Sequence, residues 1–192
     1  MSGAGDRRIF SPVANPGFHP RFGSEREWCM SERRNGLLAI GIAGGIALDQ
    51  VSKILVERWM LPTDLYTFLG GSFRVQMVRN RGAFLSLGST LPEHLRQTLL
   101  IWGVGLFLLG LTIWIFRSKT ATSTSRWCMA AVASGGIANL IDRIRFDGGV
   151  LDFLNVGIGG LRTGIFNVAD IYITFAVLWL LVDSFRGRKT QG

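Results

Sequence analysis

The stretch QTLLIWGVGLFLLGLTIWIF, residues 97–116, decides the fold class of this chain. It contains no charged residue and is bounded by Arg96 and Arg117. An α-helix needs about 20 consecutive apolar residues to cross the ~30 Å hydrocarbon core of a bilayer. The sequence therefore predicts at least one membrane-spanning helix.

Three shorter apolar stretches accompany it, and each adjoins an aspartate. They are residues 35–48, 127–141 and 171–182, next to Asp49, Asp142 and Asp170. Four such stretches in 192 residues favour an all-α membrane protein with four transmembrane helices over a soluble domain with buried helices. We expect these helices at about 36–56, 96–116, 127–145 and 166–185.

Composition supports this class and excludes others. Hydrophobic residues make up 48% and charged residues 18%, against about 25% charged in soluble domains. Only Cys29 and Cys128 are present, which excludes a disulfide scaffold, and no His or Cys pair has metal-ligand spacing. We expect no metal and no cofactor. The net charge of +8 is attributed to topology and lipid contact rather than to nucleic-acid binding.

The remaining segments complete the predicted organisation. Residues 1–35 are polar and proline-containing, which predicts a disordered cytoplasmic tail before a four-helix domain at 36–186; residues 187–192 form a short C-terminal tail. Lys and Arg are more frequent in the two tails and in the 117–126 loop than in the other loops, which places both termini in the cytoplasm.

A small β-element is predicted between the first two helices, at about 58–90. Residues 72–77 alternate polar and apolar side chains, which is typical of a strand, and residues 65–69 are the candidate partner. We expect this element on the extracytoplasmic surface.

The predicted topology brings three acids to one depth. Asp49 and Asp142 come near the outer ends of their helices, and Asp170 lies at the outer start of the last helix. All three should therefore lie in the outer leaflet, below its surface. An ionisable residue at such a depth is costly and is by default a functional hypothesis. For Asp49 a structural ion pair with Lys53, at i+4, is the competing interpretation.

Further polar residues accompany the acids. Asn139 shares a helix face with Asp142, and Asn167 stands at the same spacing before Asp170. Spacing alone favours Asp142 as the partner of Asp170. Asp152, within Val-Leu-Asp-Phe-Leu, is either a turn or helix-capping residue or an acid directed toward Asp170.

Carboxylate chemistry is what these residues permit. Two aspartates that share a site cannot both ionise easily, so one can activate water while the other polarises a carbonyl. An aspartyl hydrolase and a small proton-coupled transporter or channel both use such residues, and both remain open at this point. Transporter sites lie near the bilayer midplane, often between repeated halves, and no internal repeat is evident here.

Five short motifs, in order, carry a resemblance over about residues 37–185. They are DQVSK at 49–53, NRGAF at 80–84, GGIANLIDR at 135–143, VLDF at 150–153 and FNVAD at 166–170. With four predicted helices around them, the chain resembles the lipoprotein signal peptidase (signal peptidase II) family. Ala138 stands where the family usually has Gly, and the aromatic Phe84 is displaced by one position.

The resemblance implies an aspartic endopeptidase of the bacterial cytoplasmic membrane. It would cleave diacylglyceryl-modified prolipoproteins on the N-terminal side of the lipid-modified cysteine, in the outer leaflet, with membrane lipid as its surroundings. By motif, the catalytic pair would be Asp152 and Asp170, so that Asp142 becomes a supporting residue. The other substrate-binding or supporting residues would be Asn80, Gly82, Asn139, Asp142, Arg143, Asn167, Ala169, Asp49 and Lys53. We expect a monomer.

Overall fold

The computed structural model describes the backbone at residues 22–82, 92–118 and 120–188. The chain divides into two units, Met1–Arg34 and Asn35–Gly192. Helix α1, Phe22–Trp59, begins in the first unit, so the segment from residue 22 to 35 is helical where a disordered tail was expected. The prolines of the tail all precede residue 22, so none interrupts this helix. Residues 1–21 and 189–192 lie outside the described residues.

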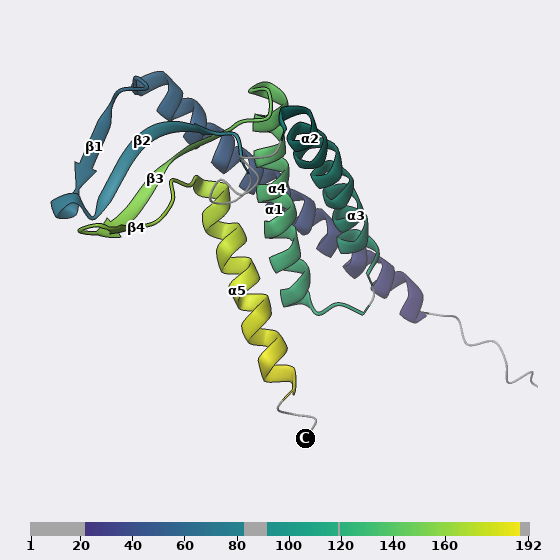
Figure 1. Cartoon of the computed structure of the whole chain (residues 1–192). Helices are drawn as coiled ribbons and strands as arrows, with labels where there is room; N and C mark the ends of the chain where they lie inside the picture. Colours follow the sequence, from purple (N-terminus) through teal and green to yellow (C-terminus); the bar gives the residue numbers. More distant parts are fainter. Residues whose placement is uncertain (1–21, 83–91, 119, 189–192) are drawn as a thin grey trace, which may run out of the picture. The chain divides into compact units, whose positions relative to one another are not determined.

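Helices make up most of the second unit (Figure 1). After α1 come α2 (Glu93–Gln97), a π-helical segment (Thr98–Gly103), α3 (Val104–Arg117), α4 (Ser123–Arg145) and α5 (Val168–Arg188). Three helical stretches are long and apolar enough to cross a membrane: Glu32–Trp59, Glu93–Arg117 and Val168–Arg186. The mostly helical membrane fold is thus confirmed, and three of the four predicted spans are found.

Helix α4 contains more buried charged residues than any of the three helical stretches that qualify as membrane spans. Its 23 residues extend about 34 Å, which is long enough to span a bilayer. It carries Arg126, Asp142 and Arg143, however, and these side chains are buried against neighbouring elements. These charged residues lower the mean hydropathy of α4, so its composition alone does not mark it as a span, and their burial inside the helix bundle shields them from the surroundings.

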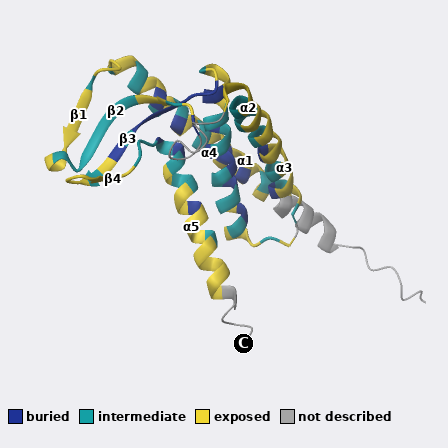
Figure 2. Cartoon of the chain, viewed as in Figure 1, coloured by how far each residue is buried: buried dark blue, intermediate teal, exposed yellow. Residues whose placement is uncertain are grey.

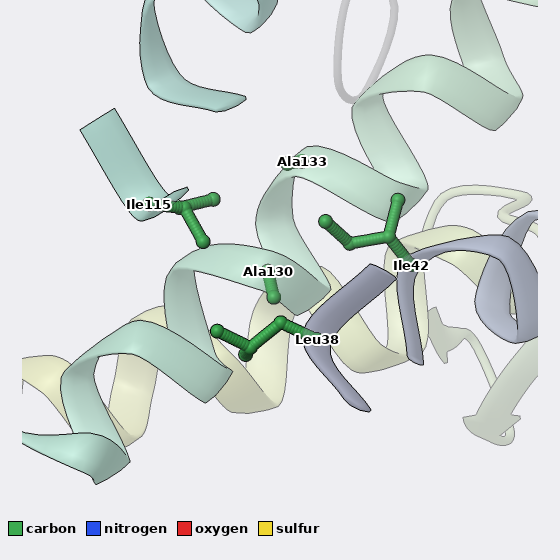
Figure 3. Close-up of a cluster of buried hydrophobic side chains, with 5 residues drawn as sticks. All are labelled: Leu38, Ile42, Ile115, Ala130 and Ala133. Atoms are coloured by element: carbon green, nitrogen blue, oxygen red, sulfur yellow. The ribbon is translucent and has the colours of Figure 1, made fainter. Parts of the chain in front are cut away.

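The core lies where α4 meets its neighbours. Leu38 and Ile42 of α1, Ile115 of α3, and Ala130 and Ala133 of α4 form one buried cluster (Figure 3). Most other large apolar side chains on the helices are exposed (Figure 2), because these surfaces face outward from the bundle. In the buried cluster, α4 contributes the small residues Ala130 and Ala133, which permit close packing of the helices, as is usual within membranes.

Two adjacent glycines of α1 allow a test of this packing. A Cβ atom at Gly45 would collide with Oγ of Ser134, which is already held by its hydrogen bond to the Ile42 carbonyl oxygen, whereas a Cβ at Gly44 would meet nothing. We expect Gly45→Ala to lower the free energy of unfolding by about 1–3 kcal/mol through overpacking. Gly44→Ala, the matched control, should leave it unchanged or slightly higher, because alanine favours helix. Thermal unfolding in detergent measures both, and equal effects would contradict this packing.

A four-stranded antiparallel sheet adjoins the helices. Its strands, in spatial order, are β1 (Leu65–Phe68), β2 (Phe73–Asn80), β3 (Val150–Ile158) and β4 (Leu161–Arg162). The predicted pairing of residues 65–69 with 72–77 is found as β1 and β2. Residues 83–91, which include Phe84 and the end of the predicted β-element, lie outside the described residues.

Strand β3 was not predicted. Residues 150–154 were interpreted as an apolar patch in the link between the last two predicted helices, yet residues 150–158 form a strand that pairs with β2 and brings Asp152 opposite Val78. Both ends of this segment carry glycines, and Val, Leu, Phe and Ile fill much of it, which is a strand signal. Asp152 is therefore neither a turn residue nor a helix cap; it lies on a strand that the sheet holds in a fixed register.

Candidate active site

Asp170 lies in the first turn of α5 and is fixed there by a capping box. The backbone N–H of Asp170 donates to Oδ1 of Asn167 at 3.1 Å, and the backbone N–H of Asn167 donates to Oδ2 of Asp170 at 3.2 Å. This reciprocal pair satisfies two backbone groups that the helix start would leave without partners. The Asn-x-x-Asp spacing noted in the sequence thus sets both the helix start and the carboxylate direction.

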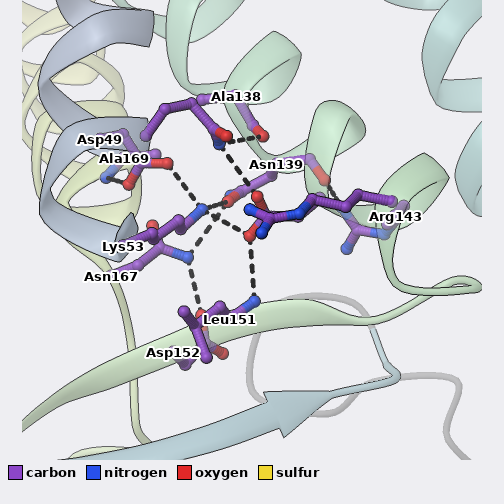
Figure 4. A network of polar contacts seen from close by, with 12 residues as sticks. Asp49, Lys53, Ala138, Asn139, Arg143, Leu151, Asp152, Asn167 and Ala169 are labelled. Atoms are coloured by element: carbon purple, nitrogen blue, oxygen red, sulfur yellow. Dashed lines mark hydrogen bonds and ion pairs between the residues drawn. The ribbon is translucent and has the colours of Figure 1, made fainter. Parts of the chain in front are cut away.

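Two asparagines connect Asp170 with Asp152. Figure 4 shows Asn139 and Asn167 together with Asp152. Nδ2 of Asn167 donates to Oδ1 of Asp152 at 2.7 Å and to Oδ1 of Asn139 at 3.1 Å. Nδ2 of Asn139 donates to Oδ1 of Asp170 at 3.2 Å. Each amide is therefore oriented by the carboxylates it contacts, and the two aspartates face one shared site.

A buried cluster of charges lies behind these asparagines. Nζ of Lys53 is 2.6 Å from Oδ2 of Asp49 and 2.9 Å from Oδ2 of Asp142, and it donates to Oδ1 of Asn139 at 3.0 Å. The predicted i+4 pair of Asp49 and Lys53 is thus present. Oδ1 of Asp49 accepts from the backbone N–H of Ala169 at 2.9 Å, which attaches α1 to the start of α5.

Asp142 contacts this cluster and not Asp170. Its Oδ2 also accepts from the backbone N–H of Leu151 at 3.0 Å, so it holds the strand that carries Asp152. Gln50, which the sequence analysis did not single out, donates from Nε2 to Oδ1 of Asp142 at 2.9 Å and to the carbonyl oxygen of Ala138 at 3.1 Å. Its place one residue after Asp49 was the only signal available, because its partners lie about ninety residues away.

The end of β2 contributes a further part of the site. Nδ2 of Asn80 donates to Oδ2 of Asp152 at 3.1 Å, and Oδ1 of Asn80 accepts from the backbone N–H of Gly82 at 2.9 Å. Nη2 of Arg143 donates to the carbonyl oxygen of Gly82 at 3.3 Å. Every residue that the sequence analysis proposed for the site therefore belongs to one connected network.

Two hollows open beside the network. One of about 270 Å³ holds both Asp152 and Asp170; the rest of its lining is Asn80, Gly82, Asn139, Arg143, Val150, Ile165, Phe166 and Ile173. A larger one of about 590 Å³ shares Asp170 and Phe166 with it. The rest of its lining is Arg162, Thr163 and Gly164 from the end of β4 onward, and Ile171, Thr174 and Phe175 along α5. A polar cavity with two carboxylates is thus joined to an apolar groove.

Electrostatics distinguish Asp152 from an ordinary surface aspartate. Burial, followed by the negative charge of Asp170, raises the pKa of Asp152 to about 6. Hydrogen bonds from Asn80 and Asn167 act in the opposite direction, since both stabilise the ionised carboxylate. Asp152 can therefore exchange a proton near neutral pH, which a general acid or base requires.

Comparison with known proteins identifies the family. The family described as signal peptidase (SPase) II matches residues 41–186, which include every residue of the network. The chain belongs to the signal peptidase II family. Membership in this family makes the chain a membrane peptidase, and it favours the hydrolase over the transporter that the sequence also permitted.

Two named relatives agree with this family, and a solved structure agrees with the fold. A lipoprotein signal peptidase from Treponema denticola is 38% identical over 142 residues, covering 72% of this chain and 82% of the relative. One from Borrelia duttonii is 34% identical over 169 residues, covering 84% and 98%. A solved bacterial membrane enzyme shares the fold seen here, with a TM-score of 0.71 and 21% identity over 82% of this chain and 92% of that one.

Proposed function

We propose that this chain is an intramembrane aspartic endopeptidase that removes the signal peptide from diacylglyceryl-modified prolipoproteins. Asp152 and Asp170 are the catalytic residues, and the cut falls N-terminal to the lipid-modified cysteine. The observation that carries this proposal is the shared cavity, in which two carboxylates from a strand and a helix start both accept hydrogen bonds from Asn167. Family membership supports the substrate class.

The proposed reaction uses one proton shared by the two aspartates. The ionised carboxylate removes a proton from water, whose oxygen attacks the scissile carbonyl carbon, while the protonated aspartate donates a hydrogen bond to the carbonyl oxygen. The tetrahedral intermediate collapses when the amide nitrogen receives a proton, which breaks the C–N bond. The products are the signal peptide with a new carboxylate and the lipoprotein with a free α-amine. No metal or cofactor takes part.

The amides have positioning roles in this reaction. Arg143 has one as well, because it holds the backbone of Gly82 next to Asn80. Asn139 and Asn167 fix the carboxylate orientations, and Asn80 holds the second oxygen of Asp152. Such preorganisation keeps the reacting groups within hydrogen-bonding reach before the substrate arrives. The apolar groove along α5 suits the hydrophobic part of a membrane-embedded substrate.

The proposed membrane arrangement completes the account. α4 is the fourth span, both termini are cytoplasmic, and the site lies in the outer leaflet of the bacterial cytoplasmic membrane. Asp170 at the start of α5 and Asp49 with Lys53 toward the end of α1 lie at one level of the bundle, which supports a common depth. A lipid anchor in that leaflet would bring the scissile bond to the two carboxylates. We propose that the enzyme acts as a monomer.

The test compares two forms of one precursor. Purified chain in detergent is given a prolipoprotein with the diacylglyceryl group on its cysteine, and the same precursor without that group. We expect cleavage of the modified form and little or none of the unmodified form. Cleavage of neither form, by folded protein, would refute the peptidase and return attention to proton transport.

The pH dependence of cleavage gives a further prediction. We expect a bell-shaped profile of kcat/KM, since acid protonates both aspartates and alkali ionises both. Asn80→Leu removes a hydrogen bond that lowers the pKa of Asp152, so the limb due to Asp152, near pH 6, should move to higher pH. A profile of Asn80→Leu that coincides with wild type, or a limb that moves to lower pH, would contradict this assignment.

A further inference from the structure

The far end of the sheet presents an apolar surface that the peptidase mechanism does not use. Two turns meet there: the one at Leu69 between β1 and β2, and the one between β3 and β4. The backbone N–H of Gly157 donates to the carbonyl oxygen of Ser72 at 2.8 Å, which places the turns side by side. We call Leu69, Ile158 and Leu161 the apolar tip.

The three side chains of the apolar tip make little contact with the rest of the protein. Leu69, Ile158 and Leu161 are 83%, 82% and 85% exposed. Apolar side chains on the helices can face lipid along a membrane span, but these three lie outside every helix with that property. Three large apolar side chains that are more than four-fifths exposed on neighbouring turns are typical of a contact surface.

The backbone at Leu69 strengthens this interpretation. Leu69 has φ 52, in the left-handed region, where a side chain with a Cβ atom costs about 1–2 kcal/mol and glycine or asparagine is favoured. Folding therefore gains nothing from a leucine at this position, which is also exposed. A residue held against both conformational preference and solvation is a candidate for a binding role.

Positive charge lies directly behind the apolar tip. Arg74 of β2 is opposite Asn155 of β3, and Arg162 donates from Nη1 to the carbonyl oxygen of Gly71 at 2.9 Å and from Nε to Asn155. The two arginines thus share a face. Within the described residues, neither forms an ion pair with a carboxylate. Nε of Arg74 and Nη2 of Arg162 are buried and have no hydrogen-bond partner there.

We propose that the apolar tip inserts into the bilayer and that Arg74 and Arg162 bind the phosphate of an anionic phospholipid at its surface. An apolar end backed by unpaired cations complements a headgroup region above acyl chains. In Figure 1 these turns lie at the end of the sheet away from the helices, at about the level of the first turns of α5, a helix long and apolar enough to span a membrane. The membrane would then hold both ends of the sheet that carries Asp152. This inference rests on the membrane spans and not on the peptidase mechanism.

Depth-dependent fluorescence quenching tests the insertion. The full chain, with Cys29→Ser and Cys128→Ser, receives a single environment-sensitive label at Leu69→Cys or Ile158→Cys. Thr63→Cys, exposed before β1 at the other end of that strand, is the matched control. In vesicles without substrate, we expect lipids with a quencher near the headgroup to cause a large loss of emission at 69 and 158 and little at 63. Aqueous iodide should give the reverse order.

Two outcomes would overturn the proposal. Iodide quenching at 69 and 158 equal to that at 63 would place the apolar tip in water, as a surface for a protein or for the substrate. For the arginines, lipid quenching at 69 should be greater in vesicles with phosphatidylglycerol than in phosphatidylcholine alone, and Arg74→Gln should reduce that difference. An undiminished difference in Arg74→Gln would refute the headgroup contact.

Discussion

Asp152→Asn and Asp170→Asn are each expected to lower kcat/KM for the modified prolipoprotein by about 10³-fold or more, because either change removes a proton donor or acceptor from the reaction. Asparagine keeps the size of the side chain and can still hydrogen-bond with Asn167, which contacts both carboxyl groups. The fold should therefore survive. Cleavage rates, measured with each variant at equal concentration of folded protein, give the result.

Asp183→Asn is the matched control for this experiment. Asp183 lies on the same helix as Asp170, near its other end, and is exposed. Its activity should equal that of wild type. If Asp152→Asn kept more than a small fraction of wild-type activity while Asp170→Asn lost it, Asp152 would be a supporting residue. Loss in Asp142→Asn and Asp170→Asn alone would instead favour the pair that spacing in the sequence suggested.

The second large effect concerns stability. Lys53→Met removes the only cation within hydrogen-bonding distance of the buried carboxylates of Asp49 and Asp142, as far as the described residues show. Loss of one partner from a buried ion pair costs about 3–5 kcal/mol, because the remaining charges stay desolvated. We expect a decrease of this size in the free energy of unfolding, measured by chemical or thermal unfolding in detergent.

An exposed ion pair provides the comparison. Nη2 of Arg145 is 3.1 Å from Oε2 of Glu57, with the arginine side chain 51% exposed. Arg145→Gln should change the free energy of unfolding by no more than about 1 kcal/mol, since solvent screens such pairs. Similar effects of Lys53→Met and Arg145→Gln would mean that the cluster around Lys53 is hydrated and does not connect the helices.

The sequence predicts those features that depend on local pattern. Residues 97–116 identify a span because the length and the hydrophobicity of a single continuous stretch are sufficient to recognise a membrane-spanning helix. Alternation at residues 72–77 and the glycines before them predict the hairpin of β1 and β2. The spacing of Asn167 and Asp170 predicts that they lie on one helix turn, and the structure shows them there, joined by the two hydrogen bonds of a capping box.

Features that depend on distant partners escaped prediction. β3 is a strand because β2 pairs with it, and about seventy residues separate the two segments. α4 carries too many charged residues to be recognised as a span from its composition, and their partners lie on other elements that the local pattern does not reveal. Asp142 was assigned to Asp170 by spacing, yet it contacts Lys53, Gln50 and the backbone of Leu151. The apolar neighbours of Asp152 left its role open between a turn or capping residue and an acid directed toward Asp170, and only the family resemblance made it the catalytic partner of Asp170.

Cleavage of the diacylglyceryl-modified precursor in ¹⁸O-labelled water tests the central claim most directly. After one turnover, with enzyme in excess, mass spectrometry of both products gives the cut site and the origin of the new oxygen. The account predicts a lipoprotein that begins with the modified cysteine, one ¹⁸O atom in the new carboxylate of the signal peptide, and none in Asp152 or Asp170. A cut elsewhere, or ¹⁸O in either aspartate with none in the signal peptide, would contradict it.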